Sequence, residues 1–136
     1  MDRSILLAEL IRDEAERLKP YTDTVGKLTI GIGRNLSDRG ISTEESRYLW
    51  NNDIDEVEKT LDRAFGWWRT LTEARQRVLV NMCFNLGLSR LLLFRKTLTA
   101  IHDGNYAEAA REMLESKWAQ QVGARAERLA KLMEDG

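Results

Sequence analysis

The segment Val78 to Leu86, VLVNMCFNL, is apolar on nearly every side of the helix that its pattern predicts. A helix of this kind needs neighbours all around it, so it must lie in the middle of a core. Thr72 gives the helix a capping start, and Gly87 is a typical residue for its end. With 136 residues, the chain can bury such a core as one domain or as two small lobes.

The stretch of residues 27–36, KLTIGIGRNL, predicts a short β-strand in a chain that otherwise has helical patterns. Its alternation places Leu28, Ile30 and Ile32 on one face and Thr29, Gly31 and Gly33 on the other. Two glycines on one face indicate close approach of a ligand such as a sugar chain, or else tight packing or a bend. The pattern alone leaves both interpretations open.

Helical spacing and turn signals give the remaining order of elements. A first helix is expected from about residue 3 to 13, with its limit at Pro20, and residues 21–33 then form a hairpin that turns at residues 24–27. After a turn at residues 37–40, a long helix runs from the capping segment 41–45 to about residue 63. Shorter helices follow the central one near residues 89–103, 105–115 and 123–133. The predicted fold class is α+β and mostly α, with a small β-hairpin lobe and a helical lobe joined by the long helix.

Composition argues against several classes of function. The single cysteine, Cys83, lies in an apolar run and is expected to be a buried, inert thiol, and the lone His102 leaves too few soft ligands for a zinc site. Residues 69–136 carry 11 basic and 8 acidic side chains, too weak an excess for a nucleic-acid partner. No continuous apolar segment is as long as the core of a signal peptide or a membrane span, so we expect neither an export signal nor stable membrane association. We also predict no metal and no cofactor.

Glu14 is the first candidate for chemistry. It continues the spacing of Leu7, Leu10 and Ile11, and so projects from the apolar face of the first helix. A carboxyl group at the border of an apolar face suits a general acid, which must hold a proton near neutral pH. The alternative is an ordinary glutamate at a helix end that reaches solvent.

Asp23 and Arg125 each have a catalytic and a structural interpretation. Asp23 could be the second carboxylate that glycoside hydrolysis needs near the first, but Asp is also a common turn residue. Arg125 and Arg128 could pair with a partly buried carboxylate, or could belong to a solvated helix face.

Taken together, these motifs resemble the phage-type lysozymes. The resemblance rests on Asp13-Glu14, on the segment 18–23, and on Gly26 with residues 29–33. It continues in residues 81–87, 94–98 and 118–128, and thus covers nearly the whole chain.

The resemblance implies a lysozyme-like single domain of residues 1–136 with its active site in a cleft between the lobes. Its small lobe would comprise about residues 14–63, including the connecting helix, and its helical lobe about residues 1–13 and 64–136. The implied reaction is hydrolysis of the β-1,4 bond between N-acetylmuramic acid and N-acetylglucosamine in peptidoglycan.

The same resemblance assigns roles to residues. Glu14 would be the general acid, Asp23 would activate or position water, and Thr29 would hold that water. Leu28, Ile30 and Ile32 would close the small lobe's core, so that Thr29 and the glycines face the cleft. Arg125 would pair with Glu14, and the expected substrate-binding residues are Gly31, Phe84, Asn85 and Thr97.

Three departures from the family pattern stand out. Ala15 replaces a glycine that often follows the catalytic glutamate, and Arg34 replaces a histidine that pairs with an aspartate in T-even relatives. We expect Arg34 to pair with Asp53 instead. The segment between the hairpin and the long helix is short, which predicts a trimmed small lobe.

Two other functions are alternatives to hydrolysis. A lytic transglycosylase would use an acid without a water-activating partner, which the presence of Asp23 and Thr29 argues against. A non-catalytic binding or scaffold protein would not need these residues. The expected partner is therefore the glycan strand of peptidoglycan, bound by a monomer. A phage enzyme of this kind would accumulate in the host cytoplasm and reach the wall through a separate holin-type membrane lesion.

Overall fold

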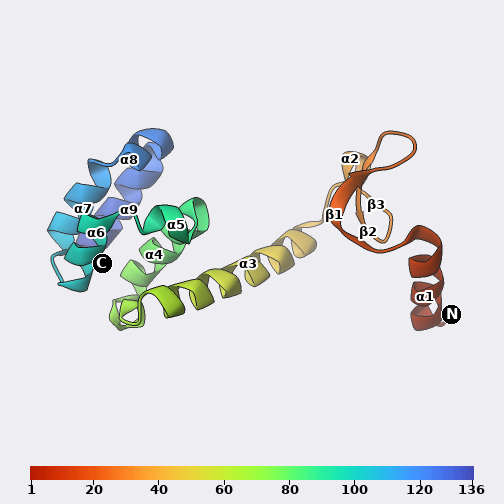
Figure 1. The fold of residues 1–136 in the computed structure, drawn as a ribbon, viewed down its shortest axis with the longest axis horizontal. Helices are drawn as coiled ribbons and strands as arrows, with labels where there is room; N and C mark the ends of the chain where they lie inside the picture. Colours follow the sequence, from red (N-terminus) through yellow and green to blue (C-terminus); the bar gives the residue numbers. More distant parts are fainter. The chain divides into compact units, whose positions relative to one another are not determined.

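The computed structural model describes all of residues 1–136 and divides into two units, residues 1–49 and residues 50–136. The boundary falls inside the long helix α3 (Figure 1). The first unit holds α1 (Arg3–Glu14), β1 (Arg17–Thr22), β2 (Leu28–Gly31), β3 (Arg34–Asn35), α2 (Leu36–Arg39) and the start of α3 (Thr43–Ala64). The second holds the rest of α3, the 3-10 turn η1 (Trp68–Thr70), α4 (Glu73–Leu86), α5 (Leu88–Leu91), α6 (Arg95–His102), α7 (Tyr106–Leu114), α8 (Lys117–Val122) and α9 (Ala124–Asp135).

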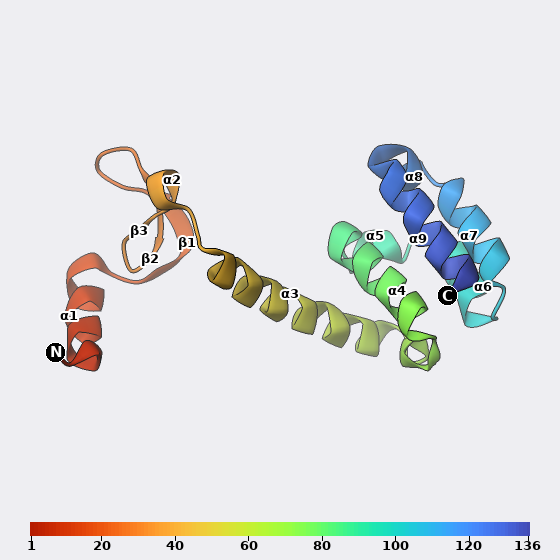
Figure 2. The same cartoon turned by 180° about the vertical axis from the view of Figure 1, so that it is seen from behind.

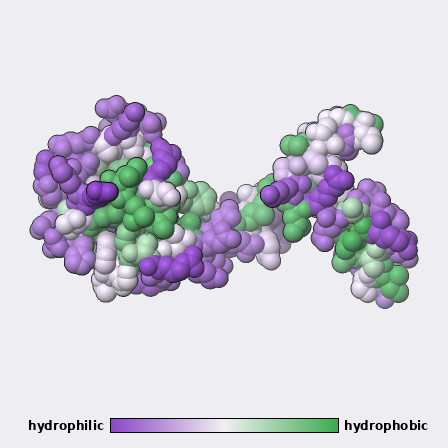
Figure 3. Space-filling view, viewed as in Figure 1, coloured by the Kyte–Doolittle hydropathy of each residue, from purple (hydrophilic) through white to green (hydrophobic).

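The helix α1 confirms the expected first helix. Asp2 caps it, because its carboxylate accepts the backbone N–H groups of Ser4 at 2.9 Å and of Ile5 at 3.2 Å. No residue of α1 is buried, and apolar side chains lie at its surface (Figure 3). The assignment of residues 1–13 to the helical lobe stays a prediction.

The three strands form one antiparallel sheet in the order β1-β2-β3. Tyr21 pairs with Thr29 and Arg17 with Gly31, and the register is irregular between Arg17 and Tyr21. This irregular segment contains Pro20, which has no N–H for a ladder bond. The sheet therefore begins before the proline, at Arg17, and not at Tyr21 as the sequence suggested.

The start of α3 follows a capping box. Glu45 N–H donates to Ser42 Oγ at 3.0 Å, and Ser42 N–H donates to Glu45 Oε1 at 2.9 Å. Two otherwise unpaired backbone donors are thus satisfied where the helix begins. The long helix expected from about residue 43 to 63 is confirmed.

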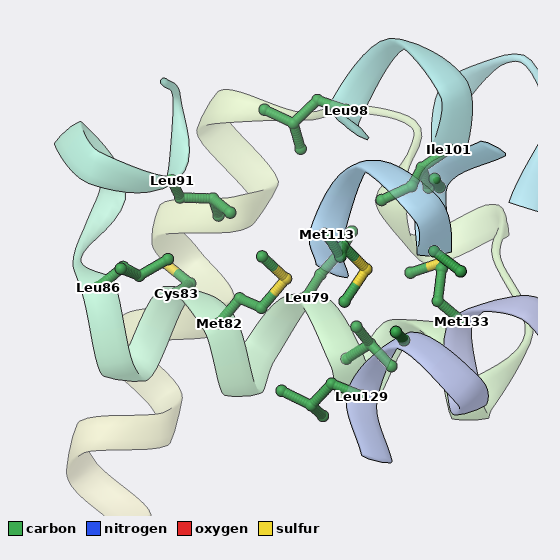
Figure 4. Close-up of a cluster of buried hydrophobic side chains, with 14 of the residues drawn as sticks. Leu79, Met82, Cys83, Leu86, Leu91, Leu98, Ile101, Met113, Leu129 and Met133 are labelled. Atoms are coloured by element: carbon green, nitrogen blue, oxygen red, sulfur yellow. The ribbon is translucent and has the colours of Figure 1, made fainter. Parts of the chain in front are cut away.

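The core of the second unit surrounds α4, as predicted. Leu79 and Met82 of this helix are fully buried against Met113 of α7 and Met133 of α9 (Figure 4). Figures 1 and 2 show α7 and α9 side by side. Cys83 is buried at 4% exposure, and desolvation raises the pKa of its thiol, which confirms the expectation of a buried thiol.

The second half has more helices than the sequence pattern predicted. The segment 89–103 is divided between α5 and α6, and α8 was not predicted at all. The α8 helix has only six residues and is capped by Ser116, whose Oγ accepts the Ala119 N–H at 3.1 Å. None of the helices combines the length and the hydropathy needed to cross a membrane.

Candidate functional site

Glu14 is the last residue of α1, and its carboxyl group lies over the turn between β2 and β3. A Cβ atom placed on Gly33 would be 3.3 Å from Glu14 Oε2 and 3.6 Å from its carboxyl carbon. Glu14 is exposed, and no hydrogen bond or ion pair ties its side chain to another group. The helix end thus presents a free carboxyl group against a bare stretch of backbone.

Ala15, directly after Glu14, has an unusual backbone conformation. Its φ is 62° and its ψ is 161°, and it is the chain's only residue other than glycine with a positive φ. This region of backbone space is nearly restricted to glycine. The conformation ends α1 and turns the chain into β1, while the Ala15 N–H still donates to Ile11 O at 2.9 Å. Strain is therefore stored beside the candidate acid.

Asp23 organises the turn between β1 and β2. Its Oδ1 atom accepts the N–H of Val25 at 3.0 Å and that of Lys27 at 2.8 Å. Its own N–H donates to Lys27 O at 2.9 Å, which extends the ladder by one pair. Asp23 is thus a turn residue, as one of the two interpretations predicted. Because no hydrogen bond uses Oδ2, this oxygen is left for other chemistry.

Thr29 lies on β2 between these two places and is buried at 4% exposure. Its hydroxyl group donates to Lys27 O at 3.0 Å. Leu28, its neighbour, is 45% exposed. The expected assignment, with Leu28 in the small lobe's core and Thr29 on the open face, is therefore wrong for these two residues. Alternation identified which residues share a face, but not which face the sheet covers.

The glycines of the β2–β3 turn differ from each other. Gly31 has φ +68° and Gly33 has φ +70°, both in the left-handed region that favours glycine. A Cβ on Gly31 would meet no atom within 4 Å, whereas one on Gly33 would meet Glu14. The turn therefore explains the need for both glycines, and only Gly31 faces open space.

Arg34 pairs with Glu45, so the expected pair with Asp53 is wrong. Its Nη1 atom donates to Glu45 Oε1 at 2.9 Å, and its Nη2 atom lies 2.8 Å from Oε2. This two-pronged contact, together with Ser42, lowers the pKa of Glu45 to about 2. The capping glutamate of α3 was therefore the nearer partner, and the pair fixes β3 against the start of that helix.

In the second unit, Arg125 and Phe84 line a pocket of about 600 Å³. Arg125, near the start of α9, donates to Asn81 Oδ1 from Nε at 3.0 Å and from Nη2 at 2.7 Å. Asn81 is a neutral acceptor, and no ion pair includes Arg125. The guanidinium group is thus held in place by a partner that leaves its charge uncompensated.

Thr97 lines a different pocket of the second unit, of about 560 Å³, beside Trp118. The Trp118 indole N–H donates to Asn85 Oδ1 at 2.8 Å, and its ring meets Phe94 edge-on at 6.0 Å between centroids. Asn85 therefore orients an aromatic wall of this pocket, which is not among the predicted roles.

Sequence reasoning missed Asn81, Trp118 and Glu45 as supporting residues. Asn81 stands one helical turn before Asn85 on α4, and Trp118 opens the motif 118–128 that had already been noted. The pairs Arg34-Glu45 and Asn81-Arg125 needed the structure, since each depends on how close two separate elements lie. No group of three or more His, Cys, Asp or Glu side chains could hold a metal ion.

The small antiparallel sheet, the long helix and the helical unit are consistent with an α+β lysozyme-like fold, as predicted. Residues 12–134 match the model of the phage lysozyme family, and the chain belongs to that family. It is thus a glycosidase of the peptidoglycan-hydrolysing class.

Individual relatives come from an amoeba and from a phage. The chain is 28% identical to probable T4-type lysozyme 1 of Dictyostelium discoideum over 153 aligned positions and 30% identical to probable T4-type lysozyme 2 over 156 positions. Each alignment covers 91% of this chain and 90% of the relative. The pre-baseplate central spike protein Gp5 of Enterobacteria phage T4 is 28% identical over 96% of this chain and 28% of its own length. Both Dictyostelium alignments are longer than this chain, so these relatives carry residues that it lacks.

Proposed function

We propose that this protein is a muramidase that hydrolyses the β-1,4 bond between N-acetylmuramic acid and N-acetylglucosamine of peptidoglycan. The observation that carries the proposal is the arrangement around β2 of the first unit. Glu14 lies at one end of this strand, Asp23 at the other, and Thr29 between them. A pair of carboxyl groups, one to protonate the leaving oxygen and one to assist a water molecule, is the minimum that this hydrolysis needs.

Glu14 is the general acid of the proposed reaction. Its free carboxyl group donates a proton to the glycosidic oxygen as the bond from that oxygen to the anomeric carbon breaks. Asp23 accepts a proton from the attacking water, whose oxygen forms the new bond to the anomeric carbon. The two carboxyl groups return to their starting states by proton exchange with solvent.

The proposed role of Thr29 is to hold the attacking water, as the family pattern implies. Its hydroxyl hydrogen is donated to Lys27 O and the residue is only 4% exposed, so Thr29 acts as an acceptor for a water molecule that reaches the covered face of β2. Asp23 is equally fixed, since two backbone N–H groups hold Oδ1 and leave Oδ2 for the same water. Both acceptors are thus positioned before the substrate arrives.

The remaining proposed roles rest on membership of the family. Arg125, whose guanidinium group donates to Asn81 within its own unit, is the proposed residue that orients the acid. Gly31, Phe84, Asn85 and Thr97 are the proposed substrate-binding residues. Of these, Phe84 is 47% exposed, as a side chain that contacts a sugar should be.

The test is muropeptide analysis of purified sacculi digested by wild type and by Glu14→Gln. We expect hydrolytic products from the wild type and none from Glu14→Gln, with unchanged circular dichroism spectra. Glu16→Gln is the matched control, because Glu16 is an exposed carboxylate two residues away with no place in the site, and this variant should keep wild-type activity.

Each alternative outcome is distinguishable. Undiminished digestion by Glu14→Gln would refute Glu14 as the acid. Products lighter by one water would identify a lytic transglycosylase, and no digestion by the wild type would favour a binding or scaffold protein.

The proposed biological role is lysis of the bacterial host for phage release. The enzyme would accumulate in the cytoplasm and reach the wall only after a separate membrane lesion. Cells of a Gram-negative host that produce the protein should therefore lyse promptly when chloroform permeabilises the inner membrane. Equally fast lysis without chloroform would contradict the need for a separate membrane lesion.

A further inference from the structure

Gly33 stands apart from the other glycines because its missing side chain makes room for the candidate acid. Of the seven glycines with positive φ, only Gly33 has any atom within 4 Å of an added Cβ. All three of the nearest atoms belong to the Glu14 side chain, at 3.3 Å for Oε2, 3.6 Å for the carboxyl carbon and 3.7 Å for Cγ.

We propose that Gly33 is a positioning residue for catalysis, whose bare Cα seats the Glu14 carboxyl group. This inference rests on the proposed function of Glu14 as general acid. It also reassigns the glycine, since the sequence pattern suggested that Gly33 leaves room for the glycan.

Little else in the first unit holds the Glu14 side chain in place. The side chain is exposed, lies at the end of a helix, and has no hydrogen-bond or ion-pair partner. The surface of the β2–β3 turn is therefore the part of the first unit that limits where the Glu14 carboxyl group can lie. A distance of 3.3 Å between a carbon and an oxygen is tighter than ordinary van der Waals contact, so a methyl group on Gly33 would displace the carboxyl group.

Displacement matters because proton transfer depends steeply on geometry. A misplacement on the order of 1 Å can lower a rate about 100-fold. An added methyl group needs the carboxyl group to move by only a few tenths of an ångström, so we expect Gly33→Ala to lower kcat several-fold and the larger Gly33→Val to lower it by about 10- to 100-fold. KM should change by less than about threefold, because the acid stabilises the transition state and contributes little to ground-state binding of the glycan.

Backbone strain is the competing explanation, and Gly40 controls for it. Gly40 has φ +60° and open space around an added Cβ, and it lies in the same unit at the end of α2. Gly40→Ala also places a side chain at a positive φ, but without a contact to Glu14. Both variants should lose stability, but Gly40→Ala should keep kcat within about twofold of wild type.

The decisive experiment is a double-mutant cycle with Glu14→Asp, measured as kcat on purified sacculi. The shorter side chain draws the carboxyl group away from Gly33. Gly33→Val should therefore cost at least fivefold less in the Glu14→Asp background than in wild type. Additive effects, or equal loss of kcat in Gly40→Ala, would overturn the inference.

Failure of this inference is separable from failure of the proposed function. If the wild type digests sacculi and Glu14→Gln does not, while Gly33→Ala keeps full kcat, only the role of Gly33 is refuted. If the wild type is inactive, the proposed function itself is refuted.

Discussion

Replacement of Ala15 by glycine should stabilise this protein, although glycine in the interior of a helix ordinarily destabilises it. Ala15 has φ 62° and ψ 161°, where a side chain costs about 1–3 kcal/mol. Glycine removes that strain but adds freedom to the unfolded chain, which costs about 0.4–1 kcal/mol. The difference predicts a net gain of about 0.5–2 kcal/mol for Ala15→Gly.

The matched control is Ala8→Gly, in the exposed interior of the same helix α1. Here glycine relieves no strain and should destabilise by about 1 kcal/mol. Urea unfolding followed by circular dichroism measures both free energies of unfolding. Amide hydrogen exchange over residues 3–15 then tests whether the change lies in α1.

The two variants should therefore move stability in opposite directions. If Ala15→Gly destabilises as much as Ala8→Gly, the residue is not strained in solution and the reasoning fails. A thermal scan gives a second measure, at about 3 °C per kcal/mol for a chain of this size.

Three further predictions follow from contacts outside the candidate site. Glu45 has a folded pKa of about 2 against an ordinary value of 4.5, so its contribution to stability is complete above pH 4.5 and is lost as pH falls toward 2. Glu45→Gln should therefore flatten the loss of stability over that range in urea titrations at several pH values. Arg75 donates from Nε to Met133 O at 2.7 Å and lies over the Tyr106 ring at 3.5 Å, so Arg75→Met should cost about 2 kcal/mol in the same assay. The Cys83 thiol should react with a disulfide reagent only in urea, and fast reaction in native buffer would contradict its burial.

The sequence predicted best the elements whose signal is strong and local. The apolar run of α4 and the capping segment before α3 specified helices within one or two residues of their observed bounds. The short helix α8 was missed because six residues carry almost no periodic signal. Its Ser116 cap and closing Gly123 were the only local indications.

The site could be predicted as a set of residues, but not as an arrangement. The resemblance to a family identified Glu14, Asp23 and Thr29, because their order and spacing can be read directly from the sequence. Which face of β2 is covered, and which acid Arg34 meets, depend on how strands and helices come together. Alternation and charge patterns carry no information on such distances, so both expectations were wrong.

Asp23 shows why the structural and catalytic interpretations of one residue do not compete. One oxygen of its carboxylate holds the turn through two backbone N–H groups, and this fixes where the other oxygen lies. An aspartate used only for chemistry would need separate groups to hold it, whereas here the turn itself does so.

Asp23→Asn therefore separates the two roles. The amide oxygen can still accept both backbone hydrogen bonds, so the free energy of unfolding should change by less than about 1 kcal/mol, while a general base is lost. Digestion of sacculi should fall sharply at nearly constant stability, and a parallel loss of both would mean that Asp23 acts only through the turn.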